Sequence, residues 1–259
     1  DTYDHREREE RIANLRTDAL REILEKEGLK GILKFAEMGK ASSQIGWLLA
    51  SRIFSRTELT EFICKAVSSE PDKDTWTRKN LLTGAVRSIR DDIERTKILE
   101  EVGRNLSDAE FISLLQLAPF RRSTWKIIDS FEGSARKKYW EEVSPDWIPE
   151  ADDENNEAVE RLIAVDRPRA AFACVHFTLE KITPDLLFKL MSEILQDGKD
   201  QLGQYQLDQY YIEQAFILMD KNAGLTVEQK ASLEFAYIDA LSQPWRDDEK
   251  TYGVPNLEK

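Results

Sequence analysis

Residues 226–242 read TVEQKASLEFAYIDALS. The apolar side chains of this stretch recur at three- and four-residue spacing, at Leu233, Ala236, Tyr237, Ala240 and Leu241. Such spacing places them on one face of an α-helix. Thr226, followed by Glu228 and Gln229, is typical of a helix start, because these side chains bond backbone N–H groups that the first turn leaves free. The stretch therefore predicts a capped, amphipathic helix.

The same pattern recurs along most of the chain. We call such a row of apolar residues on one helix face a stripe. Three further stripes are Leu207, Tyr210, Tyr211, Ala215 and Leu218; Leu59, Phe62, Ile63, Ala66 and Val67; and Phe111, Leu114, Leu115 and Ala118. Ser55 with Glu58, and Ser107 with Glu110, have the Ser-x-x-Glu pattern of a capping box. We find no run of strict apolar–polar alternation bounded by turns, which a strand would need. Glycine and proline, which favour tight turns, are also scarce, with 11 glycines and 8 prolines in the chain.

These features predict an all-α protein of about fourteen short helices. The helices are expected near 5–27, 29–38, 42–54, 56–69, 74–89, 91–104, 107–117, 123–131, 134–142, 154–165, 168–181, 184–197, 205–221 and 226–242. Short connections favour antiparallel packing of successive helices as hairpins. Such an order fits a stacked superhelix or a closed helical bundle. We expect an α-solenoid-like array of degenerate helix-turn-helix repeats, since no strict sequence period is present.

One stretch interrupts the helical pattern. Residues 143–156 (VSPDWIPEADDENN) hold two prolines followed by an acidic run. We expect an ordered acidic linker there, with Trp147 and Ile148 packed against a neighbouring helix. It would separate an N-terminal helical-repeat half, 1–142, from a C-terminal half, 157–259. Residues 168–181 are apolar on most faces, which predicts a buried inner helix in the C-terminal half.

Charge and composition disfavour several classes of protein. The net charge is −12, so a nucleic-acid partner would need a local basic patch to offset repulsion. No apolar stretch approaches the roughly 20 residues of a membrane span, and residues 1–11 do not resemble a signal peptide. Cys64 and Cys174 lack any disulfide or metal motif, which predicts buried free thiols in a reducing, cytoplasmic compartment. The chain begins at Asp1, and we expect a fragment of a longer polypeptide.

No residue pattern indicates catalysis. His5 and His176 are the only histidines, and Cys174 and His176 point in different directions on a helix. They therefore suit a shared metal poorly, and we expect His176 to be a core histidine with a satisfied hydrogen bond. Phosphate loops, dinucleotide fingerprints and nucleophile elbows are absent from the sequence. We predict no catalytic residue, no metal and no cofactor.

Basic residues beside aromatic ones are the candidate binding residues. The set comprises Arg121, Arg122, Arg136, Lys137, Lys138, Trp140 and Trp147. Such residues bind a phosphate backbone or an acidic peptide. In the alternative interpretation, the arginines and lysines follow an exposed helix face while Tyr139 and Trp140 enter the core. The six tryptophans as a group are expected to pack between helical layers.

Residues 131–245 resemble the helical region of some large bacterial multidomain proteins. The resemblance rests on Tyr139-Trp140 with Pro145, on Arg167-Pro168-Arg169-Ala170-Ala171-Phe172, and on Leu233-Glu234-Phe235-Ala236-Tyr237. It covers less than half of the chain. It implies a scaffold within a longer bacterial protein and transfers no catalytic residue.

The expected function is a non-catalytic scaffold whose concave surface binds a protein or peptide partner. Two alternatives stay open. One is an enzyme on a closed α/α-toroid that uses carboxylates such as Asp146 and Asp152, and it would need a deep cleft lined by acidic and aromatic side chains. The other is a nucleic-acid-binding helical repeat that uses the five basic residues named above, and its binding would weaken steeply with salt. No membrane partner is expected.

Overall fold

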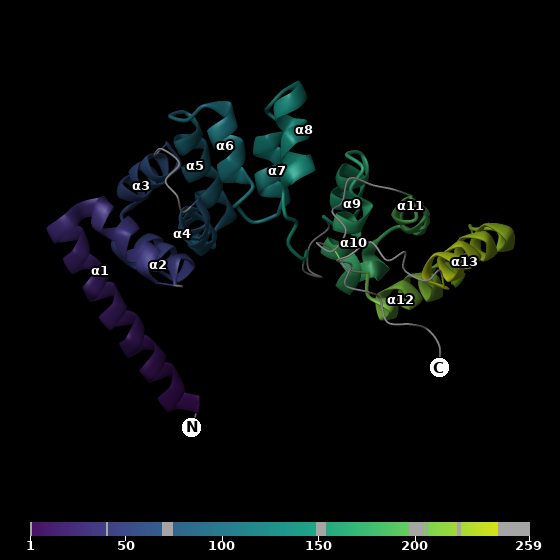
Figure 1. The fold of residues 1–259 in the computed structure, drawn as a ribbon, viewed down its shortest axis with the longest axis horizontal. Helices are drawn as coiled ribbons and strands as arrows, with labels where there is room; N and C mark the ends of the chain where they lie inside the picture. Colours follow the sequence, from purple (N-terminus) through teal and green to yellow (C-terminus); the bar gives the residue numbers. More distant parts are fainter. Residues whose placement is uncertain are drawn as a thin grey trace. The chain divides into compact units, whose positions relative to one another are not determined.

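The protein is all-α in the residues that its structure describes. The computed structural model describes residues 2–39, 41–68, 75–148, 154–196, 205, 207–221 and 224–242. These residues contain helices and connections but no strand, which confirms the predicted fold class (Figure 1). The chain divides into two compact units, Asp1–Tyr139 (unit 1) and Trp140–Lys259 (unit 2). The α-solenoid-like arrangement stays a prediction.

Unit 1 is built from short helices that pack on near neighbours in sequence. The elements are α1 (Thr2–Met38), α2 (Ser42–Leu48), the π-helix η1 (Leu49–Ile53), α3 (Arg56–Ser68), α4 (Thr75–Ser88), α5 (Asp92–Gly103), α6 (Asp108–Leu115), α7 (Arg122–Ile128) and α8 (Gly133–Glu142). α2 packs on α4, α3 on α5, and α5 on α7. The boundary between the units falls within α8.

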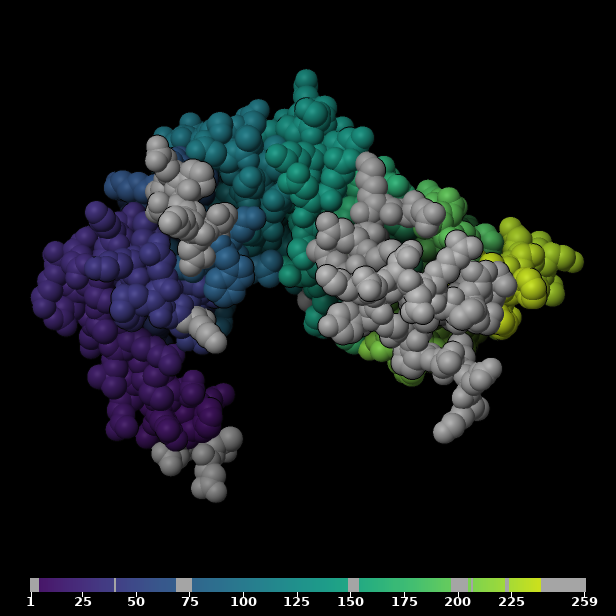
Figure 2. Space-filling view, viewed as in Figure 1, coloured from purple at the N-terminus to yellow at the C-terminus, as the bar shows by residue number. Residues whose placement is uncertain are grey.

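The first helix is bent at Gly28. Separate helices were predicted at 5–27 and 29–38, and the structure interrupts α1 between these ranges, at the non-helical Gly28. Gly28 has φ 62° and ψ −155°, a conformation that residues with a Cβ rarely adopt. Arg52 of η1 donates from Nη1 to Asn14 Oδ1 at 2.8 Å and so fastens the first part of α1. The N-terminal part of α1, purple in Figure 2, projects from the rest of unit 1 in this view.

α2 and α4 cross with their backbones in contact. A Cβ added at Gly46 of α2 would collide with the carbonyl oxygen of Leu81, and one at Gly84 of α4 would collide with that of Ser43. Each helix therefore places a glycine against the backbone of the other. This reciprocal arrangement explains why both positions lack a side chain.

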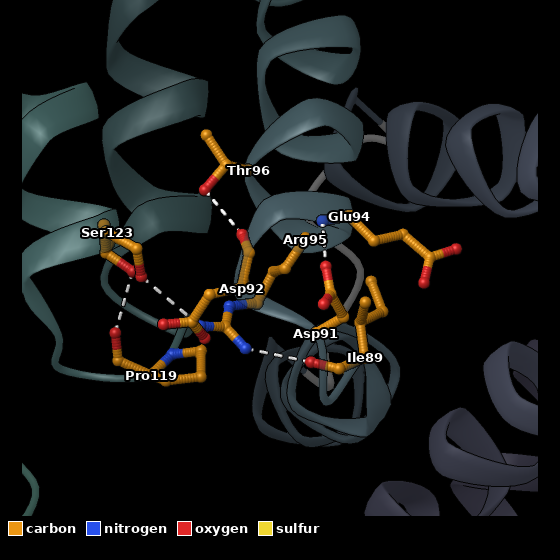
Figure 3. Close-up of polar contacts among 9 residues, drawn as sticks. Ile89, Asp91, Asp92, Glu94, Arg95, Thr96, Pro119 and Ser123 are labelled. Atoms are coloured by element: carbon orange, nitrogen blue, oxygen red, sulfur yellow. Dashed lines mark hydrogen bonds and ion pairs between the residues drawn. The ribbon is translucent and has the colours of Figure 1, made fainter.

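A buried arginine joins three elements of unit 1. Arg95 of α5 donates from Nη1 to the carbonyl oxygen of Ile89, just after α4, at 2.9 Å. Its Nη2 contacts Ser123 Oγ of α7 at 3.4 Å and pairs with Asp92 one turn earlier (Figure 3). The guanidinium thereby satisfies a loop carbonyl while its own charge is balanced by a carboxylate.

Most of the predicted stripes and caps of unit 1 are confirmed. Leu59, Phe62, Ile63 and Ala66 are buried, as are Phe111, Leu114, Leu115 and Ala118. In α3 the Ser55 N–H donates to Glu58 Oε2 at 2.8 Å, and in α6 the Ser107 N–H donates to Glu110 Oε2 at 2.9 Å. The reciprocal bonds from the Glu58 and Glu110 N–H groups complete both capping boxes.

Unit 2 contains six described helical elements after the end of α8. They are α9 (Asn155–Ile163), α10 (Pro168–Val175), the 3₁₀-helix η2 (His176–Lys181), α11 (Pro184–Ile194), α12 (Gln209–Asp220) and α13 (Val227–Ser242). α10 packs on α9 and α11, and α12 packs on η2, α11 and α13. Tyr237 of α13 donates its hydroxyl to the carbonyl oxygen of Met191 in α11 at 2.9 Å. The Thr226–Gln229 cap of α13 is also present.

A second buried arginine organises unit 2. Arg167 donates from Nη1 to the carbonyl oxygens of Trp140 and Val143 at 3.0 and 2.7 Å. Its Nη2 contacts the hydroxyl of Tyr205 at 3.2 Å, and its guanidinium lies 5.7 Å from the centre of that ring. The end of α8, the start of α10 and Tyr205 are thus held around one cation.

The predicted linker is partly described. Residues 143–148 follow α8 without helical structure, and residues 149–153 lie outside the described residues. Ile148 is buried, and its N–H donates to the carbonyl oxygen of Cys174 at 3.1 Å, so this part of the stretch is attached to α10. The domain boundaries predicted around 143–156 stay a prediction.

Two predictions about side-chain placement in unit 2 are wrong. Of the stripe predicted for α12, Ala215 is buried but Tyr210 is exposed, and Ile212 and Met219, which the stripe omitted, complete the buried face. The predicted inner helix 168–181 is buried over α10 but becomes a 3₁₀-helix at His176, and Phe177 is exposed. No helix among the described residues has both the length and the apolar character needed to cross a membrane.

Candidate interaction surface

Five aromatic side chains of unit 2 form a continuous cluster at the surface. We call the set Trp147, His176, Phe177, Tyr210 and Tyr211 the aromatic surface. The ring centre of Phe177 lies 5.8 Å from that of Trp147 and 3.9 Å from that of His176. The ring centre of Tyr211 lies 4.6 Å from that of His176, 5.3 Å from that of Phe177 and 5.1 Å from that of Tyr210. Trp147, Phe177 and Tyr210 expose 48%, 52% and 59% of their area. Large rings gathered and exposed in this way are unusual away from binding sites.

Trp147 is directed outward by the burial of its neighbour. Ile148 enters the core and bonds the end of α10 through its N–H. Successive side chains of a non-helical, extended segment point to opposite sides. Trp147 therefore lies on the outer side, where its ring meets that of Phe177 edge to face, at an interplanar angle of 87°.

His176 and Phe177 are directed outward by the change from α-helix to 3₁₀-helix. Val175, Thr178 and Leu179 are buried, so the two residues between Val175 and Thr178 face outward. Thr178, with φ −137° and ψ 32°, bends the backbone at this point. His176 Nδ1 lies 2.7 Å from the carbonyl oxygen of Ala173 and must donate there, because a carbonyl only accepts. The predicted hydrogen bond is thus present, but the ring is half-buried at the surface and not in the core.

Tyr210 and Tyr211 enter the cluster from the first turn of α12. Asp208 caps this helix by accepting the Tyr210 N–H at 2.8 Å. α12 packs on η2, which brings Tyr211 against both His176 and Phe177. Adjacent residues on a helix point about 100° apart, so one of two consecutive tyrosines can be half-buried while the other is exposed.

The elements that carry the aromatic surface are acidic. Asp146, Glu180, Asp208 and Glu213 lie on the segments 144–148, 176–181 and 208–217, which contain one basic residue, Lys181. The imbalance extends to the whole unit. Residues 140–259 contain 25 acidic and 11 basic residues, whereas residues 1–139 contain 24 acidic and 26 basic residues. The negative charge of the protein therefore belongs to unit 2.

Two titratable groups of unit 2, Cys174 and Tyr237, are buried in its core. Burial raises the pKa of the Cys174 thiol far above its usual range, so the thiol stays protonated and unreactive. Burial also raises the pKa of the Tyr237 hydroxyl, and nearby Arg169 offsets this rise only in part. Among the described residues, no group of three or more histidine, cysteine or carboxylate side chains is placed to hold a metal ion. The cluster itself offers apolar and π-face contacts.

The predicted binding residues fall into three environments. Arg121 and Arg122 are half-buried at the start of α7, whereas Arg136, Lys137 and Lys138 are exposed on α8. Trp140 is buried beneath Arg161, whose guanidinium lies 5.2 Å from the ring centre. The burial of Tyr139 and Trp140 beside exposed basic residues matches the alternative interpretation of α8. A binding role for the basic residues stays a prediction.

Trp147 is the predicted binding residue that belongs to the aromatic surface. The other four members were not selected from the sequence. His176-Phe177 and Tyr210-Tyr211 are both pairs of consecutive aromatic residues, and two adjacent positions on a helix cannot both face a single packed neighbour. The same pattern occurs at Tyr139-Trp140, where both rings are buried, so it could not by itself have identified the aromatic surface. The six tryptophans do not share one environment, because Trp125 and Trp140 are buried, Trp47, Trp76 and Trp147 are exposed, and Trp245 lies outside the described residues.

Comparison with known proteins adds no assignment to this geometry. No family model, no curated protein and no solved structure matches the chain.

Proposed function

We propose that this protein is a non-catalytic interaction scaffold that binds a protein partner through the aromatic surface of unit 2. The observation that carries the proposal is the joint exposure of Trp147, Phe177 and Tyr210, whose rings are linked through Tyr211 and His176. Tryptophan and tyrosine are enriched at the centres of protein interfaces, because they supply a large apolar area at little cost in side-chain entropy.

Contacts between the rings and hydrogen bonds of the supporting backbone restrict the cluster, which favours binding further. Each contacts at least one other ring, and Ile148, Asp208 and the hydrogen bond of His176 hold the supporting backbone. A surface that is ordered before binding loses less entropy when a partner docks. The α-solenoid-like array that we propose for the helices would display such a surface on a rigid support.

Selection from a random-peptide display library tests this function without assuming a partner. The immobilised full-length chain should enrich related peptides, and Phe177→Ser or Tyr210→Ser should abolish their retention. Phe235→Ser is the matched control, because Phe235 is exposed on α13 of the same unit and belongs to no part of the aromatic surface. Peptides retained equally by the wild type and the two cluster variants would contradict the proposal, as would a failure to enrich any sequence.

A further inference from the structure

The charge around the aromatic surface indicates what kind of partner it suits. Glu180 is exposed on the same short helix as Phe177. Glu213 is exposed three residues after Tyr210, a spacing that places both side chains on one side of α12. Asp208 is exposed at the start of the same helix. Two of the three elements that form the cluster thus carry exposed carboxylates within three residues of its rings.

The aromatic faces also attract cations. The ring quadrupole presents negative potential on the face of Trp, Tyr and Phe, where a guanidinium or ammonium group binds. Unit 2 already uses this contact internally, with Arg161 over Trp140 at 5.2 Å and Arg167 over Tyr205 at 5.7 Å. The cation–ring pairs at Trp47, Trp140 and Tyr205 include no ring of the aromatic surface.

We propose that the occupant of the aromatic surface is a basic segment of a protein partner, with arginine or lysine side chains that stack on the exposed rings and pair with the carboxylates of Glu180, Asp208 and Glu213. This inference rests on the proposed function. An acidic segment would meet repulsion from unit 2, where acidic residues outnumber basic ones by 25 to 11. A neutral segment would use the rings but gain nothing from Glu180, Asp208 and Glu213. A basic segment gains from both.

Binding to three synthetic peptides of equal length tests the inference. One alternates glycine and arginine, the second replaces each arginine with citrulline, its uncharged isostere, and the third is oligoproline. Titration into the full-length chain is followed by the indole N–H resonance of Trp147, assigned with Trp147→Phe. The arginine peptide should shift this resonance and bind about fivefold more tightly than the citrulline peptide. Its affinity should fall as salt rises from about 0.05 to about 0.5 M.

Two kinds of variant separate the contributions of the rings and of the carboxylates. Phe177→Leu keeps an apolar side chain but removes the ring face, and should weaken binding of the arginine peptide about threefold. Glu180→Gln and Glu213→Gln should each weaken it about twofold. Glu228→Gln is the matched control, because Glu228 is an exposed carboxylate on α13 of the same unit, and it should leave affinity unchanged.

Several results would overturn the inference. One is that the citrulline peptide or oligoproline binds as tightly as the arginine peptide, or more tightly. Another is that the affinity for the arginine peptide does not respond to salt. The third is that no concentration of the arginine peptide shifts the Trp147 resonance. Self-association of the chain that Phe177→Leu abolishes would identify a second copy as the occupant and would also overturn it. The proposed function would survive any of these results if the display selection still enriched peptides that depend on the cluster.

Discussion

At the scale of single residues, Arg95 illustrates how unit 1 uses a buried charge. Its guanidinium is almost fully covered, yet it reaches Ile89, Asp92 and Ser123 from one position (Figure 3). A side chain with several donors in a fixed plane can satisfy acceptors on different elements at once. A lysine or methionine at this position could fill the same volume, but neither could donate hydrogen bonds in the same directions as the guanidinium.

We expect Arg95→Met to lower the free energy of unfolding by about 2–3 kcal/mol, because the Ile89 carbonyl would lose a charge-assisted hydrogen bond in a buried site. Arg56→Met is the matched control. Arg56 pairs with Glu101 at 3.1 Å, but both side chains are about half exposed, so its loss should cost under about 1 kcal/mol. Urea unfolding followed by circular dichroism measures both. Equal effects would show that Arg95 does not support the junction of α4, α5 and α7.

At the scale of elements, the crossing of α2 and α4 depends on two glycines. Gly46 and Gly84 each face the backbone of the opposite helix, where no side chain is available to move aside. Shape complementarity of this kind tolerates no added methyl group. The tolerance at other glycines differs, since a Cβ at Gly39 would have no neighbour closer than 3.9 Å.

Gly46→Ala and Gly84→Ala should therefore each destabilise the protein by about 2–3 kcal/mol or more, because the two helices must separate to admit the methyl group. Gly39→Ala should change stability by less than about 0.5 kcal/mol. Thermal unfolding of the three variants under identical conditions gives the comparison. A neutral Gly46→Ala would mean that the crossing is looser than this backbone contact requires.

The capping boxes of α3 and α6 should respond to acid. Hydrogen bonds from the Ser55 and Ser107 side chains and backbone lower the pKa of Glu58 and Glu110 below the usual range of a glutamate. Because the pKa is lower in the folded state, the boxes stabilise the helices fully above the unfolded-state pKa. That stabilisation is lost as pH falls through the folded-state values.

Carboxyl-carbon NMR titration should find the pKa of Glu58 and of Glu110 below the usual range of a glutamate. Ser55→Ala and Ser107→Ala are the controls, each removing the hydroxyl of one box. Each should raise the pKa of its own glutamate and leave the other unchanged. If the serine substitutions moved neither value, the hydrogen bonds would not be the cause of the lowered pKa values.

At the scale of the whole molecule, the two units differ in charge. Acidic residues exceed basic ones, 25 to 11, in residues 140–259, while residues 1–139 are near balance. Repulsion among like charges opposes a compact state and is screened by salt. Unit 2 should therefore gain more stability from added salt than unit 1.

Hydrogen exchange measured by mass spectrometry tests this difference in the intact chain. Raising sodium chloride from about 0.01 to about 0.5 M should slow amide exchange in α9, α10 and α11 more than in α2, α4 and α5. The helices of unit 1 serve as the internal control for general effects of salt on exchange. Equal slowing in both sets of helices would contradict a stability difference that arises from charge.

The helical class, most helix positions and the caps follow from local sequence, because they depend on hydrogen bonds and side-chain pairs within about four residues. Ser107 with Glu110 and the stripe from Leu59 to Ala66 are examples. The tertiary structure alone decided which side chains at element ends turn outward. Tyr210 and Phe177 looked like core residues, yet burial of Ile212 and Thr178 leaves both exposed. The aromatic surface arises because Trp147, η2 and α12 are brought together by packing between distant segments, which local spacing does not encode.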